Sequence, residues 1–325
     1  MAPVKETVKV KSQIITDKYC LYNDDCCKVM PKLKSGSIGH SIFSPPFSDL
    51  YSYSDDLADI GNNSYSGFMK HFGFVVKELY RLLMPGRVCA IHCMDLPTYK
   101  RSGEEIGLRD FSGDLIRLFQ EHGFIFHSRH CIWKDPLVAA TRTKAIGLAH
   151  KQIVKDSAMC RMGIPDYLLA FRKPGENPKP ISHPTGLQTY HGSREIPKTL
   201  DRFMVPDDEY DGKTDKRSHW IWQKYASPVW DDIRQTKVLQ FRAARDEEDT
   251  KHICPLQIDV IERCMVLWTA PGDTVLTPFL GIGSEAYVAV KNGRKAIGIE
   301  LKSRYFRTAV KNVKRAAEMA DRRLF

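Results

Sequence analysis

The last quarter of the chain shows the clearest alternation of apolar and polar segments. It predicts, in order, a strand, a glycine loop, a helix and a second strand over 274–276, 279–284, 285–292 and 295–300. Asn292-Gly293 ends the helix, because glycine adopts positive φ at little cost. A single βαβ unit cannot bury both faces of its strands. The other strands of the sheet must therefore come from earlier in the chain.

The first half of the chain supplies such strands. Short apolar segments predict them over 37–43, 88–93, 124–133 and 167–172. Apolar residues at helical spacing predict a helix over 68–84, which Pro85-Gly86 ends, and another near 113–122. Alternating strands and helices favour an α/β fold with a predominantly parallel sheet.

Between these two α/β halves the composition of the sequence changes. From Lys173 to about Arg245, proline, glycine, histidine, aromatic and charged residues crowd together without sustained apolar periodicity. A segment of this length between two halves of one sheet is typical of an inserted functional region. We therefore expect a first half-domain at 1–174, an insertion at 175–245 and a second half-domain at 246–325.

Composition narrows the class of protein. Hydrophobic residues make up 42% and charged residues 27% of the 325 residues, which excludes a wholly disordered chain and a membrane bundle. No apolar run approaches the ~20 residues that span a bilayer, so we expect no membrane partner. The 49 Lys and Arg outnumber the 39 Asp and Glu, for a net charge of +10. That excess suits a polyanionic partner such as nucleic acid.

The nine cysteines do not predict a disulfide framework, because the count is odd and the N-terminus shows no secretory segment. We expect reduced thiols and a cytoplasmic protein. Cys89, His92 and Cys93 lie close together, but no CxxC pair completes a tetrahedral site. We therefore interpret them as buried core residues and predict no metal.

The glycine loop is a candidate cofactor site. Residues 281–286, Gly-Ile-Gly-Ser-Glu-Ala, fit GxGxxG/A between a strand and a helix, and Glu300 ends the next strand. Such loops let a backbone approach an anion at a helix N-terminus, and the acid accepts hydrogen bonds from ribose hydroxyls. A dinucleotide and S-adenosylmethionine both fit this pattern.

A second candidate site is Ser44-Pro45-Pro46-Phe47, at the end of a predicted strand, where open α/β sheets build their active sites. An exocyclic amine of a nucleobase is a poor nucleophile, because its lone pair is delocalised into the ring. Hydrogen bonds from its two protons to the Ser44 hydroxyl and the Pro45 carbonyl would free that lone pair. The prolines fix the acceptors, and Phe47 would stack on a base that has been flipped out of the duplex.

These motifs resemble those of the amino-methylating DNA methyltransferases, which modify cytosine N4 or adenine N6 with S-adenosylmethionine. The family's tetrapeptide is Asp, Asn or Ser followed by Pro-Pro and an aromatic residue, and its cofactor loop resembles Asp-Pro-Phe-x-Gly-x-Gly. Here the loop is Thr277-Pro278-Phe279-Leu280-Gly281-Ile282-Gly283. The catalytic motif precedes the cofactor loop, as in the family's β group. The resemblance implies a Rossmann-like methyltransferase sheet in circularly permuted order, with 175–245 as target recognition region.

The resemblance also implies further cofactor contacts. Asp25 stands where the family has an acid near the adenine, and His252 begins a segment, 251–263, similar to the helix before the cofactor loop. With the loop and Glu300, the implied binding residues are Asp25, His252, Thr277, Pro278, Phe279, Gly281, Gly283, Ser284 and Glu300. One departure is Thr277, where the family usually has Asp.

The implied activity is site-specific methylation of double-stranded DNA in a bacterial or phage-infected cell. Ser at the first tetrapeptide position favours cytosine N4, with adenine N6 as the alternative. A catalytically silent DNA-binding relative and a nicotinamide (NAD)-dependent oxidoreductase are the more distant alternatives. A homodimer and a cognate restriction endonuclease, as in a restriction-modification pair, are open as partners. Basic residues over 134–173 and the basic and aromatic residues over 217–224 are candidate DNA contacts.

Overall fold

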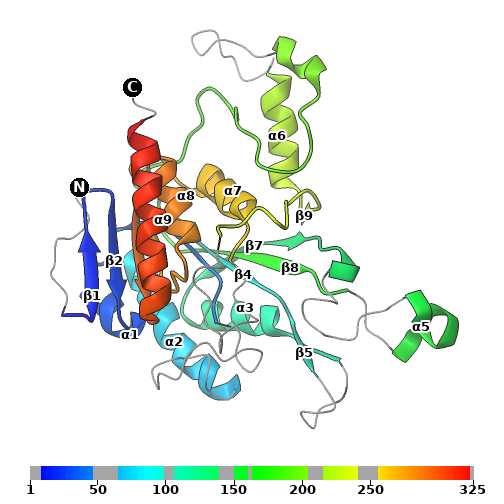
Figure 1. Ribbon diagram of the computed structural model, residues 1–325, viewed down its shortest axis with the longest axis horizontal. Helices are drawn as coiled ribbons and strands as arrows, with labels where there is room; N and C mark the ends of the chain where they lie inside the picture. Colours follow the sequence, from blue (N-terminus) through cyan, green and yellow to red (C-terminus); the bar gives the residue numbers. More distant parts are fainter. Residues whose placement is uncertain are drawn as a thin grey trace.

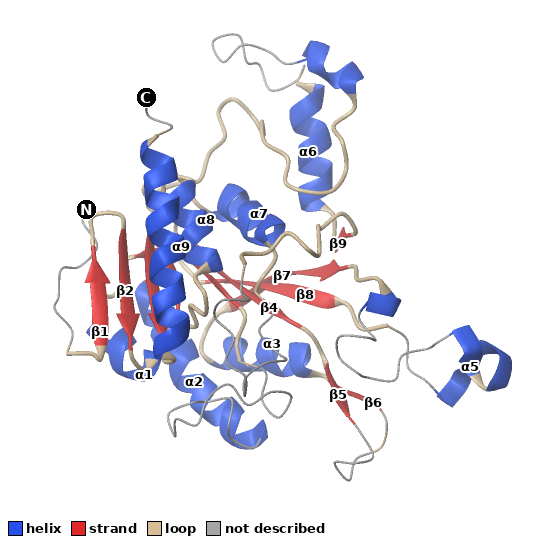
Figure 2. Cartoon of the chain, in the orientation of Figure 1, coloured by secondary structure: helices blue, strands red, loops and turns tan. Residues whose placement is uncertain are grey.

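A nine-stranded sheet forms the centre of the part of the protein that the computed structural model describes (Figures 1 and 2). That part comprises residues 9–46, 65–98, 105, 107–138, 150–159, 163–203, 215–240 and 255–322. The strand order is β1-β2-β11-β10-β3-β4-β8-β7-β9. The strands are β1 (Ser12–Ile15), β2 (Tyr19–Asn23), β3 (Ile38–Phe43), β4 (Leu83–Cys93), β7 (Ile125–Ile132), β8 (Asp166–Arg172), β9 (Val229–Trp230), β10 (Thr274–Thr277) and β11 (Lys295–Glu300). A separate hairpin pairs β5 (Leu96–Thr98) with β6 (Gly107–Arg109).

Strands from opposite ends of the chain lie side by side in this sheet. β10 pairs in parallel with β3, with Val275 opposite His40 and Leu276 opposite Ser41. β11 pairs in parallel with β2 in the same way. The C-terminal βαβ unit is thus completed by N-terminal strands, which confirms the permuted α/β order expected from the sequence.

Helices cover both faces of the sheet (Figure 2). α2 (Tyr65–Leu82) and α3 (Phe111–Glu121) pack on one face, and α7 (Ile258–Trp268), α8 (Ser284–Lys291) and α9 (Ser303–Asp321) on the other. The other described helices include α1 (Cys26–Val29), η1 (Met30–Lys32), α5 (His150–Lys155), η4 (Ser157–Met159), η5 (Lys198–Phe203) and α6 (Lys216–Ala226). No described helix has both the length and the apolar character needed to cross a bilayer.

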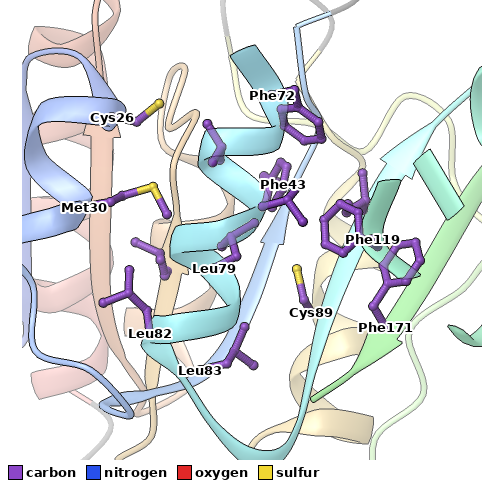
Figure 3. Close-up of a cluster of buried hydrophobic side chains, with 14 of the residues drawn as sticks. Cys26, Met30, Phe43, Phe72, Leu79, Leu82, Leu83, Cys89, Phe119 and Phe171 are labelled. Carbon is purple, nitrogen blue, oxygen red and sulfur yellow. The ribbon is translucent and has the colours of Figure 1, made fainter. Parts of the chain in front are cut away.

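The core beneath α2 joins the two halves of the chain. Side chains of α2, α3 and the sheet interdigitate there, and Figure 3 shows Phe43, Phe72 and Phe119 among them. Phe43 and Phe72 are both fully buried, with ring centroids 6.3 Å apart. Burial of each such ring stabilises the fold by roughly 1.5–3 kcal/mol. β3 is therefore held firmly in the position from which it presents the residues that follow it.

The junction of α2 and β4 differs from the sequence prediction. The helix ends at Leu82, and β4 begins at Leu83, before Pro85-Gly86 rather than after it. The register between β3 and β4 shifts there, and Gly86 has φ of 71°. Pairing of Leu83 with Ile38 favours strand over helix, so the Pro-Gly pair marks an irregularity in the strand.

The segment after β8 returns to the sheet. β9 pairs in parallel with β7, and the preceding α6 stands above this edge (Figure 1). Arg263 of α7 is fully buried against the segment: its Nε donates to the backbone oxygen of His191 at 2.7 Å, and its guanidinium lies 2.8 Å from Asp232. The same guanidinium lies over the rings of Tyr225 and Trp230. This segment is therefore anchored to the helix that precedes β10.

Candidate active site at the carboxyl ends of the strands

The predicted site residues lie along one edge of the sheet. β2, β11, β10 and β3 are neighbours that run in parallel, so their carboxyl ends meet at the same edge. Asp25, Glu300, Thr277 and Ser44 lie at or just after these four ends. This edge is where open α/β sheets bind their ligands.

The tetrapeptide and the glycine loop are in contact through the residues beside them. Phe43, immediately before Ser44, lies with its ring centroid 5.6 Å from that of Phe279. Pro45 is buried and Pro46 partly exposed. Two of the predicted site residues, Phe47 and His252, lie outside the described residues. The two motifs thus lie side by side at one edge of the sheet although they are far apart in the sequence.

Ser44 belongs to a polar network that the sequence analysis missed. Its Oγ lies 3.0 Å from Nδ1 of His92, at the end of β4. Nε2 of His92 lies 3.0 Å from Oδ2 of Asp166, and Nζ of Lys134 lies 2.5 Å from the other carboxylate oxygen, Oδ1. Burial raises the pKa of the Asp166 carboxyl, but His92 and Lys134 outweigh burial and hold it below its usual range.

Antiparallel pairing explains why these residues meet. β8 runs antiparallel to β4 and β7, so its first residue, Asp166, lies at the edge where those strands end. Cys89 and Cys93 are buried in the core, as expected. His92 is buried as well, but its ring nitrogens contact Ser44 and Asp166, which the interpretation as an ordinary core residue did not anticipate. The alternation of side chains along β4 was the available signal, because neighbours point to opposite faces.

Glu300 closes the glycine loop. Its Oε2 accepts a hydrogen bond from the backbone N–H of Gly281 at 2.7 Å, and its Oε1 accepts one from Lys302 N–H at 2.9 Å. Gly283 has φ of 90°, and a Cβ there would lie 3.1–3.2 Å from Ala309 of α9. Glycine is therefore required at 283 for both backbone conformation and close helix packing.

Two buried hydroxyls flank the same loop. Thr277 Oγ1 and Ser284 Oγ are both nearly inaccessible, and neither has a hydrogen-bond partner among the described residues. Buried polar atoms are normally satisfied, so such orphans indicate a missing ligand or water. Gly281 has open space beside it, with no atom within 4 Å of the point where a Cβ would lie. These features fit a polar cofactor such as S-adenosylmethionine at this loop.

Asp25 is committed partly to local structure. It caps α1 by accepting a hydrogen bond from Cys27 N–H at 2.8 Å. Nearby, Asn23 Nδ2 donates to the backbone oxygen of Glu300 at 2.7 Å, which fixes the end of β2 to the end of β11. This cap places the Asp25 carboxylate beside the end of β2.

Comparison with known proteins assigns the family. A family profile described as DNA methylase matches residues 38–311, most of the chain. The chain belongs to this DNA methylase family. The resemblance to amino-methylating methyltransferases is thereby confirmed.

Individual relatives of the chain extend the comparison. The type II methyltransferase M.BamHI of Bacillus amyloliquefaciens is 24% identical over 295 residues, which cover 90% of this chain and 57% of that protein. The chain thus spans little more than half of that relative's length. Among solved structures, the Thermus thermophilus protein TTHA0409 with S-adenosyl-L-methionine is 20% identical (TM-score 0.58; coverage 92% of this chain and 96% of that one). The cytosine-N4-specific PvuII DNA methyltransferase is 16% identical (TM-score 0.56; coverage 94% and 92%). These likenesses confirm the Rossmann-like methyltransferase fold.

The basic residues predicted as DNA contacts divide into two groups. Lys134 and Lys173 are used internally: Lys134 pairs with Asp166, and Lys173 donates to the backbone oxygen of Leu83 at 2.8 Å. Their prediction as phosphate contacts does not fit these partners. On α6, by contrast, Trp222 is exposed and Lys224 lies over the ring of Trp220. α6 therefore presents both charge and aromatic surface to a ligand.

Glu285, in the first turn of α8, makes the stability of the protein depend on pH. Burial raises the pKa of its carboxyl from 4.5 to about 8. In the unfolded chain the Glu285 carboxyl is ionised above its ordinary pKa of 4.5. In the folded protein it stays protonated up to about pH 8. The free energy of unfolding should therefore fall as pH rises between these values.

We expect Glu285→Gln to remove this pH dependence. Between about pH 5 and about pH 8 the wild type should lose on the order of 3 kcal/mol of stability relative to the variant. Urea unfolding at the two pH values measures the difference, and Glu121→Gln, at an exposed position of α3, is the matched control. If the free energy of unfolding changed equally with pH in the wild type and in Glu285→Gln, Glu285 would be ionised in the folded protein.

Proposed function

We propose that this DNA methylase transfers a methyl group from S-adenosylmethionine to an exocyclic amino group of a base in double-stranded DNA, with cytosine N4 favoured. The observation that carries the proposal is the contact between Phe43 and Phe279, which joins the Ser-Pro-Pro segment to the glycine loop at one sheet edge. An amine held at the first motif would face a methyl donor held at the second. Family membership supports the reaction class.

On this proposal, Ser44 and Pro45 are the residues that activate the amine. Its two protons are donated to the Ser44 hydroxyl oxygen and to the Pro45 carbonyl, which favours a pyramidal nitrogen with a free lone pair. Pro45 and Pro46 restrict the backbone, so the acceptors need little reorganisation. Phe47 stacks on the base, which must be flipped out of the duplex.

The cofactor, when bound, supplies an electrophilic methyl group. Glu300 and Asp25 offer carboxylate oxygens to its hydroxyl and amino groups, and the hydroxyls of Thr277 and Ser284 offer polar contacts at the loop. The proposed binding residues, as the sequence predicts them, are Asp25, His252, Thr277, Pro278, Phe279, Gly281, Gly283, Ser284 and Glu300. A hydroxyl at 277 keeps a hydrogen-bond acceptor but lacks the charge of aspartate.

Glu300→Ala should weaken cofactor binding by at least ~10-fold, because it removes an acceptor for the ligand and frees the Gly281 N–H that organises the loop. Isothermal titration with S-adenosylmethionine measures the effect. Glu318→Ala, a substitution on the outer helix α9, should bind as wild type does. Equal affinity of wild type and Glu300→Ala would remove Glu300 from the cofactor site.

Residues 175–245 are proposed as the target recognition region between the two halves of the catalytic domain, 1–174 and 246–325. The exposed Trp222 and the Lys224–Trp220 pair on α6 support this role. Single bases stack on such rings, and basic side chains contact phosphates. The homodimer and the cognate endonuclease stay predictions.

Sequencing of modified bases in DNA from a host that expresses the protein tests the proposal. The expected result is N4-methylcytosine at one recurring sequence motif, absent from the host without the gene. N6-methyladenine at a recurring motif would keep the reaction class and refute the base. Methylation of neither amine would favour the catalytically silent DNA-binding alternative.

A further inference from the structure

Three polar residues lie in a row behind Ser44. Ser44, His92, Asp166 and Lys134 come from the ends of β3, β4 and β7 and from the start of β8. Consecutive contacts of 2.5–3.0 Å link them into one chain. The ion pair of Lys134 with Asp166 is thus connected to Ser44 through the ring of His92.

The Asp166 carboxylate fixes which nitrogen of His92 carries the proton. His92 Nε2 lies 3.0 Å from Asp166 Oδ2, which is within ion-pair distance, although the contact does not have regular hydrogen-bond geometry among the described residues. An ionised carboxylate can only accept hydrogen bonds, so this contact favours the proton on Nε2. Asp166 is almost completely buried, and Lys134 beside it keeps it charged. Nδ1 of His92 is then left with a free lone pair, 3.0 Å from the Ser44 hydroxyl.

We propose that His92, held by Asp166 and Lys134, is a positioning residue that accepts a hydrogen bond from the Ser44 hydroxyl, so that the Ser44 oxygen faces the target amine as a hydrogen-bond acceptor. This inference rests on the proposed function. Serine hydroxyls rotate freely and donate as readily as they accept. Binding of the hydroxyl proton by Nδ1 turns the oxygen lone pairs away from His92 and toward the amine.

The same arrangement removes the proton that the reaction releases. The amine nitrogen forms its bond to the methyl carbon with its lone pair, while the carbon–sulfur bond pair stays on sulfur. The positively charged nitrogen then gives one proton to the Ser44 oxygen, as the Ser44 hydroxyl proton passes to Nδ1 of His92. The resulting imidazolium is stabilised by Asp166 until it loses a proton to water. Charge and atoms balance without another reactant.

His92→Asn separates this role from simple packing. The asparagine side chain can accept a hydrogen bond from Ser44 but cannot take its proton at neutral pH. Single-turnover methyl transfer to duplex DNA should slow by at least ~10-fold, with unchanged affinity for S-adenosylmethionine and DNA. His130→Asn is the matched control, because His130 is equally buried but contacts the backbone oxygen of Ser227 on the far side of β8. That variant should keep the wild-type rate.

A double variant tests whether His92 acts through Ser44. Ser44→Ala combined with His92→Asn should be no slower than Ser44→Ala alone, since the two residues work as one unit. If the rate of the double variant fell by the product of the two single effects, the proposal would be overturned, because His92 would then act independently of Ser44. A His92→Asn rate within about two-fold of wild type would overturn it as well.

A spectroscopic readout needs no turnover. Imidazole ¹⁵N shifts of labelled protein, assigned with His92→Asn, should show a protonated Nε2 and an unprotonated Nδ1 for His92, and Asp166→Asn should abolish this preference. The reverse tautomer would overturn the proposal even if the enzyme is active. A wild type that transfers no methyl group but shows the predicted tautomer would refute the proposed function and leave the assigned geometry supported.

Discussion

Ser44→Ala should reduce the rate of methyl transfer by ~10²–10³-fold while leaving the affinity for S-adenosylmethionine unchanged. Removal of one preorganised hydrogen-bonding group from a transition state has effects of this size. The alanine leaves the amine with the Pro45 carbonyl as its acceptor and leaves Nδ1 of His92 without its partner. The change removes one exchangeable hydroxyl and little volume, so the fold should be kept.

Single-turnover rates with radiolabelled cofactor, together with calorimetric binding, measure this effect. Ser37→Ala is a suitable control, because Ser37 precedes the same strand at its opposite end and its hydroxyl donates to the local backbone oxygen of Lys34 at 2.6 Å. A rate for Ser44→Ala within a few-fold of wild type would refute the assigned role of Ser44.

Arg87→Ala should lower the free energy of unfolding by about 3–5 kcal/mol. Arg87 is fully buried at the start of β4, where it forms an ion pair with the buried Asp273 that precedes β10. Its Nε also donates to the backbone oxygen of Gly39 at 2.8 Å. Loss of the guanidinium leaves the Asp273 carboxylate buried without its cation. It also removes the side-chain contacts that link β3, β4 and β10 at the edge opposite the active site.

Urea unfolding measures this loss against Arg117→Ala. Arg117 forms an exposed ion pair with Asp114 on α3, and such pairs contribute ~0–1 kcal/mol. We also expect Asp273→Asn to recover part of the stability of Arg87→Ala, because the double variant buries no unpaired charge. Equal stabilities for Arg87→Ala and Arg117→Ala would contradict the importance of the buried pair.

Local patterns sufficed to predict the parts of the fold that have strong apolar periodicity. β11 has its predicted bounds, and β10 and α8 differ from prediction by one residue at their ends. α6 was missed, because it buries only Ser218, Ile221 and Tyr225 and so shows a weak apolar stripe. The resemblance predicted a helix over 251–263, whereas the observed helix, α7, runs from Ile258 to Trp268. Its ends depend on tertiary packing rather than on local sequence.

The candidate site was predictable only where motifs are contiguous. The glycine loop and the tetrapeptide are short contiguous segments, so their chemistry can be predicted from the local sequence. The permuted strand order then predicts that they lie close together. His92, Asp166 and Lys134 carry no motif. Their meeting depends on the antiparallel register of β8 against β4 and β7, with Asp166 opposite Ile132 and next to the pair of Cys93 with Tyr167. Long-range register of this kind is not encoded in any short window of sequence.

The most direct test of the account uses purified protein, duplex DNA and S-adenosylmethionine with a labelled methyl group. After one turnover the DNA is digested, and mass spectrometry locates the label in each nucleoside. We predict label on an exocyclic amino nitrogen, with that of cytosine favoured over that of adenine. Label at a ring carbon, or unlabelled DNA from protein that binds both ligands, would contradict the claim that one site joins an activated amine to the methyl donor.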